Sequence, residues 1–185
     1  MLTRRQLIKT GVLGGALLGV ARFGYGPLEA DPVYAVVDPA RFKVLDAASR
    51  SAMAAIGRVM LAGALPEAPA ARDIALQEFV HGADIAISGL PGVVQDEVKQ
   101  LLMLLTNRFT RRWVVGITKP WGEASDDDIG NFLSRWRYSS LVLLRSGYQA
   151  LHQVVFAAWY GNPHAWVGIG YDGPPAFVKD FFKHG

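Results

Sequence analysis

The side chains that most often perform catalysis or bind metals are sparse in this sequence of 185 residues. It has no cysteine, which excludes disulfides, thiol nucleophiles, c-type haem attachment and Cys-ligated zinc or iron–sulfur clusters, because each of these needs sulfur. The spacing of the four histidines matches no metal-ligand pair, and none lies in a recognisable catalytic arrangement. We therefore expect structural roles for these histidines, which are His81, His152, His164 and His184.

Two short strings match functional motifs, and both have simpler explanations. Residues 168–173 satisfy the G-x-G-x-x-G pattern of dinucleotide-binding loops, but Pro174 and Pro175 follow and leave no room for a strand–helix–strand unit. The three aspartates at 126–128 lack the alternating ligands and central glycine of a calcium loop. Ser125 followed by these carboxylates instead predicts a helix start, where exposed N–H groups and the helix dipole favour negative charge.

Aromatic residues are concentrated in the last 77 residues, which hold 15 of the 20 aromatic side chains and all five tryptophans. Tyr and Trp in a Gly- and Pro-rich loop can anchor a partner protein, because they bury large areas at small entropy cost. The alternative, in which the loop folds back onto its own helices, is equally compatible with this composition. The residues that we assign to a partner interface, with Trp166 and Tyr171 as its anchors, are Trp159, Tyr160, Trp166, Tyr171, Pro174 and Pro175.

Helical periodicity dominates the segments that must position these residues. Asp38 and Pro39 predict the first turn of a helix that ends near Gly63. Further helices are expected over 72–88, from about Val94 to Phe109, from Ser125, and from about Ser139 to Tyr160. The breaker-rich residues 64–70 predict a link, and residues 110–124 predict irregular structure.

The last helix should place a mixed aliphatic and aromatic stripe on one face, made of Leu144, Tyr148, Leu151, Val155 and Trp159. No alternation typical of strands stands out in the sequence. The sequence therefore predicts an all-α fold: a single irregular domain of four to six helices with a loop-rich, aromatic carboxyl-terminal segment, preceded by a signal segment.

Residues 1–30 have the composition of a targeting segment, with a basic start, an apolar run over 10–21 and small residues after it. The apolar run is shorter than the roughly 20 residues that a membrane-spanning helix needs. Arg4, Arg5 and Lys9 stand in an order that closely resembles the twin-arginine export consensus. We interpret 1–30 as a twin-arginine signal that is cleaved after Ala30 or Ala35, or is kept as an anchor, and 31–185 as the exported domain.

The net positive charge of the chain is not shared evenly by these two segments. The chain has 19 Lys and Arg against 16 Asp and Glu, and its excess of positive charge lies in residues 1–30. Residues 31–185 hold 15 basic and 15 acidic side chains. Nucleic-acid binding needs a clustered basic excess that neutralises phosphates. The balance therefore argues against a nucleic-acid partner.

Several short strings of the body occur in a recognisable order. They are Asn-Phe-Leu-Ser-Arg-Trp at 131–136, Ala-Ala-Trp-Tyr-Gly-Asn-Pro at 157–163, Trp166, and Ile-Gly-Tyr-Asp-Gly-Pro at 169–174. Together with the twin-arginine-like leader and the helical body, they resemble the gluconate 2-dehydrogenase subunit 3 family. The resemblance is clearest at the two ends of the chain.

The resemblance implies a small subunit that has no cofactor and no catalytic site of its own. Its expected partner is the large flavoprotein subunit of a periplasmic glucose-methanol-choline (GMC) type dehydrogenase, which binds FAD and commonly passes electrons to a multihaem cytochrome c subunit. The small subunit would carry the folded flavoprotein through the twin-arginine translocase. Two alternatives remain open at this point: a standalone periplasmic all-α binding or scaffold protein, and an enzyme with an unrecognised site.

Overall fold

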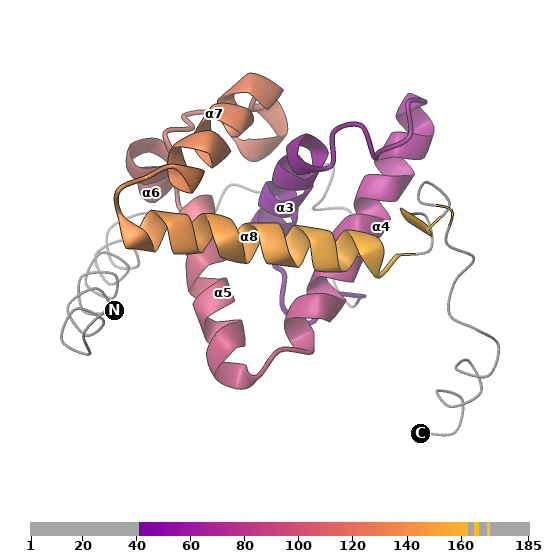
Figure 1. Cartoon of the computed structure of the whole chain (residues 1–185), viewed down its shortest axis with the longest axis horizontal. Helices are drawn as coiled ribbons and strands as arrows, with labels where there is room; N and C mark the ends of the chain where they lie inside the picture. Colours follow the sequence, from indigo (N-terminus) through magenta and orange to yellow (C-terminus); the bar gives the residue numbers. More distant parts are fainter. Residues whose placement is uncertain (1–40, 163–164, 167–169, 171–185) are drawn as a thin grey trace.

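The computed structural model of this protein describes residues 41–162, 165, 166 and 170, and within them every regular element is helical (Figure 1). This confirms the predicted all-α class and the range of four to six helices. The leader and His164 and His184 lie outside the described residues. The α-helices are α3 (Ala47–Met60), α4 (Pro69–Ser88), α5 (Gly92–Thr106), α6 (Arg108–Thr110), α7 (Asp126–Arg137) and α8 (Val142–Tyr160).

The first described helix, α3, begins later than the sequence predicted, since residues 42–46 are not helical and Asp46 is the N-cap. The side chain of Asp46 accepts the backbone N–H of Ser49 at 2.8 Å. The prediction of a helix running from Asp38 is therefore wrong. The reason is a long-range contact: the buried carboxylate of Asp84 on α4 accepts the backbone N–H groups of residues 43, 44 and 45, each at 2.8 Å. These hydrogen bonds keep the N–H groups of residues 43–45 out of a helical turn.

Helix α4 begins at Pro69, three residues before the predicted start, with proline in the first turn where its missing N–H costs nothing. It ends at Ser88, as predicted. Helix α5 stops at Thr106, short of the predicted end at Phe109. Asn107 interrupts it, because its side chain accepts the N–H of Phe109 at 3.0 Å and so caps the short helix α6.

The stretch predicted as irregular contains two short helical turns, the π-helix η2 (Arg111–Val115) and the 3₁₀ helix η3 (Trp121–Glu123). The π-helix ends at Gly116, whose φ of 81° lies in the left-handed region that favours glycine. Trp121 is buried, and its indole N–H donates to the carbonyl oxygen of Leu105 at 3.0 Å. A single tryptophan thus ties this stretch to the end of α5.

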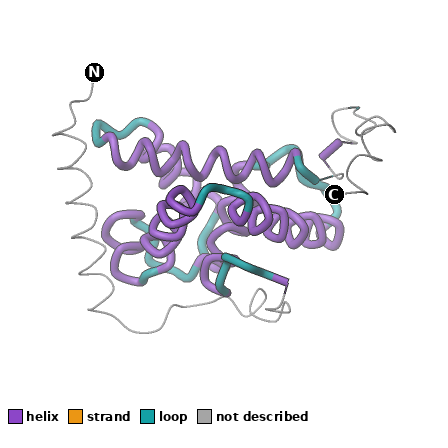
Figure 2. The backbone as a smooth tube through the Cα atoms, turned by 90° about the horizontal axis from the view of Figure 1, so that it is seen from below, coloured by secondary structure: helices purple, strands orange, loops and turns teal. Residues whose placement is uncertain are grey.

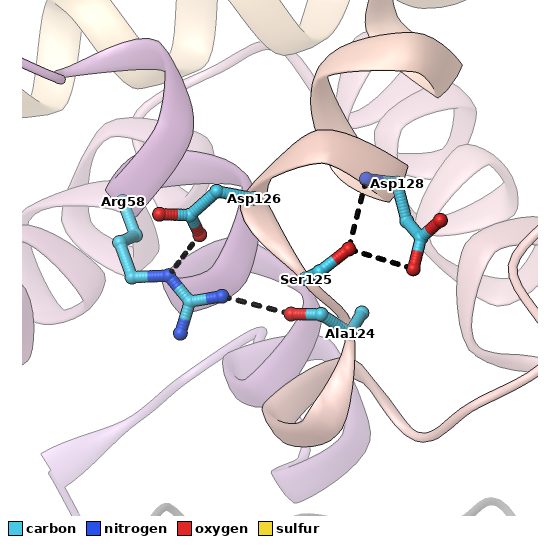
Figure 3. Close-up of polar contacts among 5 residues, drawn as sticks. All are labelled: Arg58, Ala124, Ser125, Asp126 and Asp128. Carbon is cyan, nitrogen blue, oxygen red and sulfur yellow. Dashed lines mark hydrogen bonds and ion pairs between the residues drawn. The ribbon is translucent and has the colours of Figure 1, made fainter.

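Helix α7 starts as the sequence predicted, with Ser125 as its N-cap and the three aspartates in its first turn. The hydroxyl oxygen of Ser125 accepts the N–H of Asp128 at 3.1 Å (Figure 3). Arg58 on α3 donates from Nε to Asp126 Oδ1 at 2.8 Å and from Nη2 to the carbonyl of Ala124 at 3.0 Å. The aspartate cluster therefore begins the helix and joins it to α3.

Helix α3 lies at the centre and packs against α4, α5, α7 and α8. Helix α8 crosses the front of the others in Figure 1, and the view from below places it along one edge of the molecule (Figure 2). Close approach needs glycine at two crossings: a Cβ on Gly57 of α3 would overlap the ring of Phe79 on α4, and one on Gly147 of α8 would meet Trp136 of α7 at 2.7 Å. One face of α8 is thereby buried and the other is left outward.

Candidate partner-binding surface

Four ring-bearing side chains follow one another along α8 at steps of four residues, which places them on one face of the helix. The ring centroids lie 6.0 Å apart between Tyr148 and His152, 4.4 Å apart between His152 and Phe156, and 6.0 Å apart between Phe156 and Tyr160. The last pair is stacked, with an angle of 22° between the ring planes. We call these four side chains the aromatic ladder.

The aromatic ladder is half-buried along most of its length and becomes exposed at its carboxyl end. Tyr148, His152 and Phe156 are each half-buried, whereas Tyr160 is 49% exposed. Tyr148 and Phe156 pack against the hydrophobic core with part of their surface. The ladder is therefore supported by the core and by contacts between its rings, and part of its surface faces solvent.

Polar contacts fix both ends of the aromatic ladder. At one end the guanidinium of Arg137 lies 5.8 Å from the centroid of the Tyr148 ring, within the range of a cation–π contact. At the other end the indole N–H of Trp166 donates to the carbonyl oxygen of Tyr160 at 2.8 Å. Trp166 itself is half-buried. These contacts extend the aromatic surface past the ends of the ladder.

The residues that the sequence assigned to the interface lie in different surroundings in the structure. Tyr160 belongs to the aromatic ladder, and Trp166 is hydrogen-bonded beside it. Trp159 is only 3% exposed and belongs to the hydrophobic core, so its assignment to a partner surface is corrected to a core role. Tyr171, Pro174 and Pro175 lie outside the described residues.

Sequence reasoning placed Tyr148 on a core stripe and gave Phe156 no role. Leu151, Val155 and Trp159 of that stripe are buried, but Tyr148 is only half-buried. The signal that could have revealed the aromatic ladder was the recurrence of ring-bearing residues at i, i+4, i+8 and i+12. His152 contributes to it as a ring packed between two others.

A pocket of about 210 Å³ lies between α3, the start of α4 and η3. Two arginines line it, and both are already engaged. Arg58 bonds to Asp126 and Ala124, and Arg72 donates to the carbonyl oxygens of Pro66 and Glu67 at 3.1 Å. The pocket is smaller than the roughly 300 Å³ at which ordinary ligand sites begin. It is thus a weaker candidate than the aromatic ladder.

Two further kinds of feature are absent from the residues that the structure describes. No cluster of three or more His, Cys, Asp or Glu side chains in this part of the chain could bind a metal ion. No helix within the same residues combines the length and the apolar character needed to cross a membrane.

Comparison with known proteins identifies no relative: no family model, curated protein or solved structure matches this chain. Its function is therefore inferred from its own residues and their arrangement. Among the described residues, the aromatic ladder is the largest ordered array of partly exposed rings.

Proposed function

We propose that this chain is a non-catalytic small subunit of a periplasmic, FAD-dependent, GMC-type dehydrogenase that oxidises a sugar or an alcohol. In this role it escorts the flavoprotein subunit through twin-arginine export and stabilises it afterwards. The observation that carries the proposal is the aromatic ladder, an ordered series of four partly exposed rings along α8. The leader with Arg4 and Arg5 supports the export role, and the family resemblance supports the partner.

The aromatic ladder suits a binding role because the core is filled by other aromatic residues. Phe132 lies between Trp121 and Trp136, with ring centroids 6.1 and 4.9 Å away in edge-to-face geometry, and all three are buried. The rings of the aromatic ladder lie outside this cluster, although Tyr148 and Phe156 also pack against the core with part of their surface. Rigid aromatic side chains lose little conformational entropy on binding, which favours their use as interface anchors.

This proposal gives each subunit of the complex its own role. FAD belongs to the flavoprotein, whose electron acceptor in the family that this chain resembles is commonly a multihaem cytochrome c subunit. The present chain contributes a docking surface and an export signal. A folded flavoprotein without a signal of its own requires such an escort, because the twin-arginine route exports folded proteins.

Export provides the test of this proposal. Replacing Arg4 and Arg5 with Lys should leave both this chain and the coexpressed flavoprotein in the cytoplasm, because the paired arginines are the part of the signal that the translocase recognises. Arg22→Lys, in the same leader but outside the pair, is the matched control and should export normally. Dehydrogenase activity that persists in the periplasm of the double variant would contradict the escort role.

A standalone binding protein is the second candidate, and the 210 Å³ pocket beside Arg58 and Arg72 is the feature that favours it. A binding protein should purify as a stable monomer, whereas a subunit should copurify with a yellow flavoprotein. Affinity purification of the coexpressed chain, followed by mass spectrometry and an absorption spectrum, distinguishes the two.

A further inference from the structure

Acidic and basic residues are segregated in this domain, although their numbers balance. Residues 98–122 contain five basic side chains and no acidic one, and residues 129–162 contain three basic side chains and no acidic one. Folding brings these two segments together, since the indole N–H of Trp136 donates to the carbonyl oxygen of Val114 at 3.5 Å and Arg135 donates to that of Val115. Of these eight, Arg111 is buried and Lys99 pairs with Asp96 at 3.6 Å. The basic region of the otherwise neutral body therefore consists of the exposed side chains of Arg108, Arg112, Lys119, Arg135, Arg137 and Arg145.

The same region exposes large apolar side chains at one end of the molecule, where α6 lies near the link between α7 and α8 (Figure 1). Trp113 on η2 is 70% exposed and Tyr138 after α7 is 75% exposed. Aliphatic side chains at the start of α8, which follows this link in the chain, are also exposed. We call this surface the end patch; its apolar members are Phe109, Trp113, Tyr138, Leu141, Val142 and Leu143.

Arginine side chains accompany the aromatic members of the end patch. The guanidinium of Arg112 lies 6.0 Å from the ring centroid of Trp113, and that of Arg137 lies 5.3 Å from the ring of Tyr138. Arg145, one turn into α8, is also exposed and donates to the carbonyl of Ser139. The exposed rings of Trp113 and Tyr138 thus each have a positive charge beside them.

We propose that the end patch binds the surface of a membrane that contains anionic phospholipids. Tryptophan and tyrosine favour the boundary between headgroups and acyl chains, because one part of each ring is apolar and the other polar. Leu141, Val142 and Leu143 supply apolar side chains that can enter this boundary, and the arginines match the lipid phosphates. The charge of the region and the character of its apolar side chains therefore point to the same partner.

Three other exposed apolar residues lie close to acidic residues in the sequence instead. Ile74 on α4 follows Asp73, and Val93 and Val94 on α5 precede Asp96 and Glu97. Carboxylates are repelled by an anionic membrane. A nucleic acid would also be attracted by the arginines, but the three consecutive aliphatic residues at the start of α8 favour lipid.

The end patch and the aromatic ladder use different parts of α8. The helix begins within the end patch at Val142, and the exposed end of the aromatic ladder is at Tyr160. Lipid binding goes beyond the proposed subunit role and can be measured without the flavoprotein.

Because the chain has no cysteine, a single introduced thiol can report which part of it meets the membrane. Ser140→Cys lies in the exposed link of the end patch, and Gln77→Cys is an exposed control on α4. Each full-length variant is labelled with a polarity-sensitive dye and mixed with phosphatidylcholine vesicles with or without about 30% phosphatidylglycerol. We expect a blue shift from the Ser140 position with anionic vesicles, and none from the Gln77 position. The leader is present in both variants, so the difference reports the folded surface.

A second pair of variants tests the arginines. Arg112→Gln with Arg145→Gln should lower the partition coefficient onto anionic vesicles by about tenfold or more, because each basic residue near such a surface contributes to the attraction. Arg41→Gln with Lys43→Gln removes the same charge from an exposed segment before α3 and should bind like the wild type. Circular dichroism verifies that all variants keep their helix content.

Three results would overturn the inference. They are equal dye shifts at the two labelled positions, unchanged binding of the Arg112 and Arg145 double variant, and a dye shift at Ser140 with double-stranded DNA but not with vesicles. Copurification with the flavoprotein is measured without lipid, so these three results would leave the proposed function untouched.

Discussion

The imidazole of His152 and the ring of Phe156 lie 4.4 Å apart, centroid to centroid, in the middle of the aromatic ladder. Pairs of Phe, Tyr or Trp rings contribute about 0.5–1.5 kcal/mol beyond the area they bury, and the stacked rings of Phe156 and Tyr160 are such a pair. Three ring contacts in sequence hold the aromatic ladder in place before any partner arrives. A pre-ordered surface loses less entropy on binding, which favours the exposed end at Tyr160 as the point of strongest contact.

Tyr160→Ala should weaken association with the flavoprotein by about 2 kcal/mol or more, roughly 30-fold, because it removes the most exposed ring of the aromatic ladder. The melting temperature of the isolated chain should change little. Tyr138→Ala is the matched control, since it removes another exposed tyrosine, at the carboxyl end of α7. Copurification and calorimetry on both variants measure the two effects, and equal weakening by both substitutions would refute this role for Tyr160.

Trp159→Ala should show the reverse behaviour, although it is the adjacent residue. Its side chain is buried in the core, so truncation should lower the free energy of unfolding by about 3–5 kcal/mol. Urea denaturation of the isolated chain measures this loss. A Trp159→Ala variant that is stable but fails to bind the flavoprotein would instead show that Trp159 belongs to the interface.

Asp84→Asn should destabilise the domain by about 3 kcal/mol, because the buried carboxylate accepts three backbone N–H groups and an amide cannot accept all of them. Asp73→Asn, an exposed position on the same helix, is the control and should change stability by less than about 0.5 kcal/mol. Chemical denaturation measures both. Similar midpoints for the two variants would show that the contact contributes little.

Gly57→Ala should destabilise the packing of α3 on α4 by about 1–3 kcal/mol, because the added Cβ would overlap the ring of Phe79. Gly130→Ala on α7 has open space for its Cβ and should stabilise the domain by about 0.5–1 kcal/mol through helix propensity. Thermal melts of the pair are expected to shift in opposite directions. A rise in melting temperature for both would show that Phe79 moves aside at no cost.

The sequence by itself determined the helices whose ends depend on neighbouring residues. Ser125 and the aspartates after it specify the start of α7, because the cap bond joins residues three positions apart. The end of α8 at Tyr160 is followed by glycine, and the end of α4 at Ser88 is also followed by glycine. In these cases the residue that starts or ends the helix lies within a few positions of the helix that it caps.

Only the tertiary structure decided the features that depend on distant segments. The start of α3 was missed because the residues before it bond to Asp84, about 40 positions away. Trp159 and Tyr160 are neighbours of similar chemistry, and sequence could not tell that one is 3% exposed and the other 49%. The end patch was hidden in the same way, since segments 98–122 and 129–162 form one basic region only after folding. Burial and surface charge depend on which helices cover α8, and that arrangement is set by packing across the whole chain.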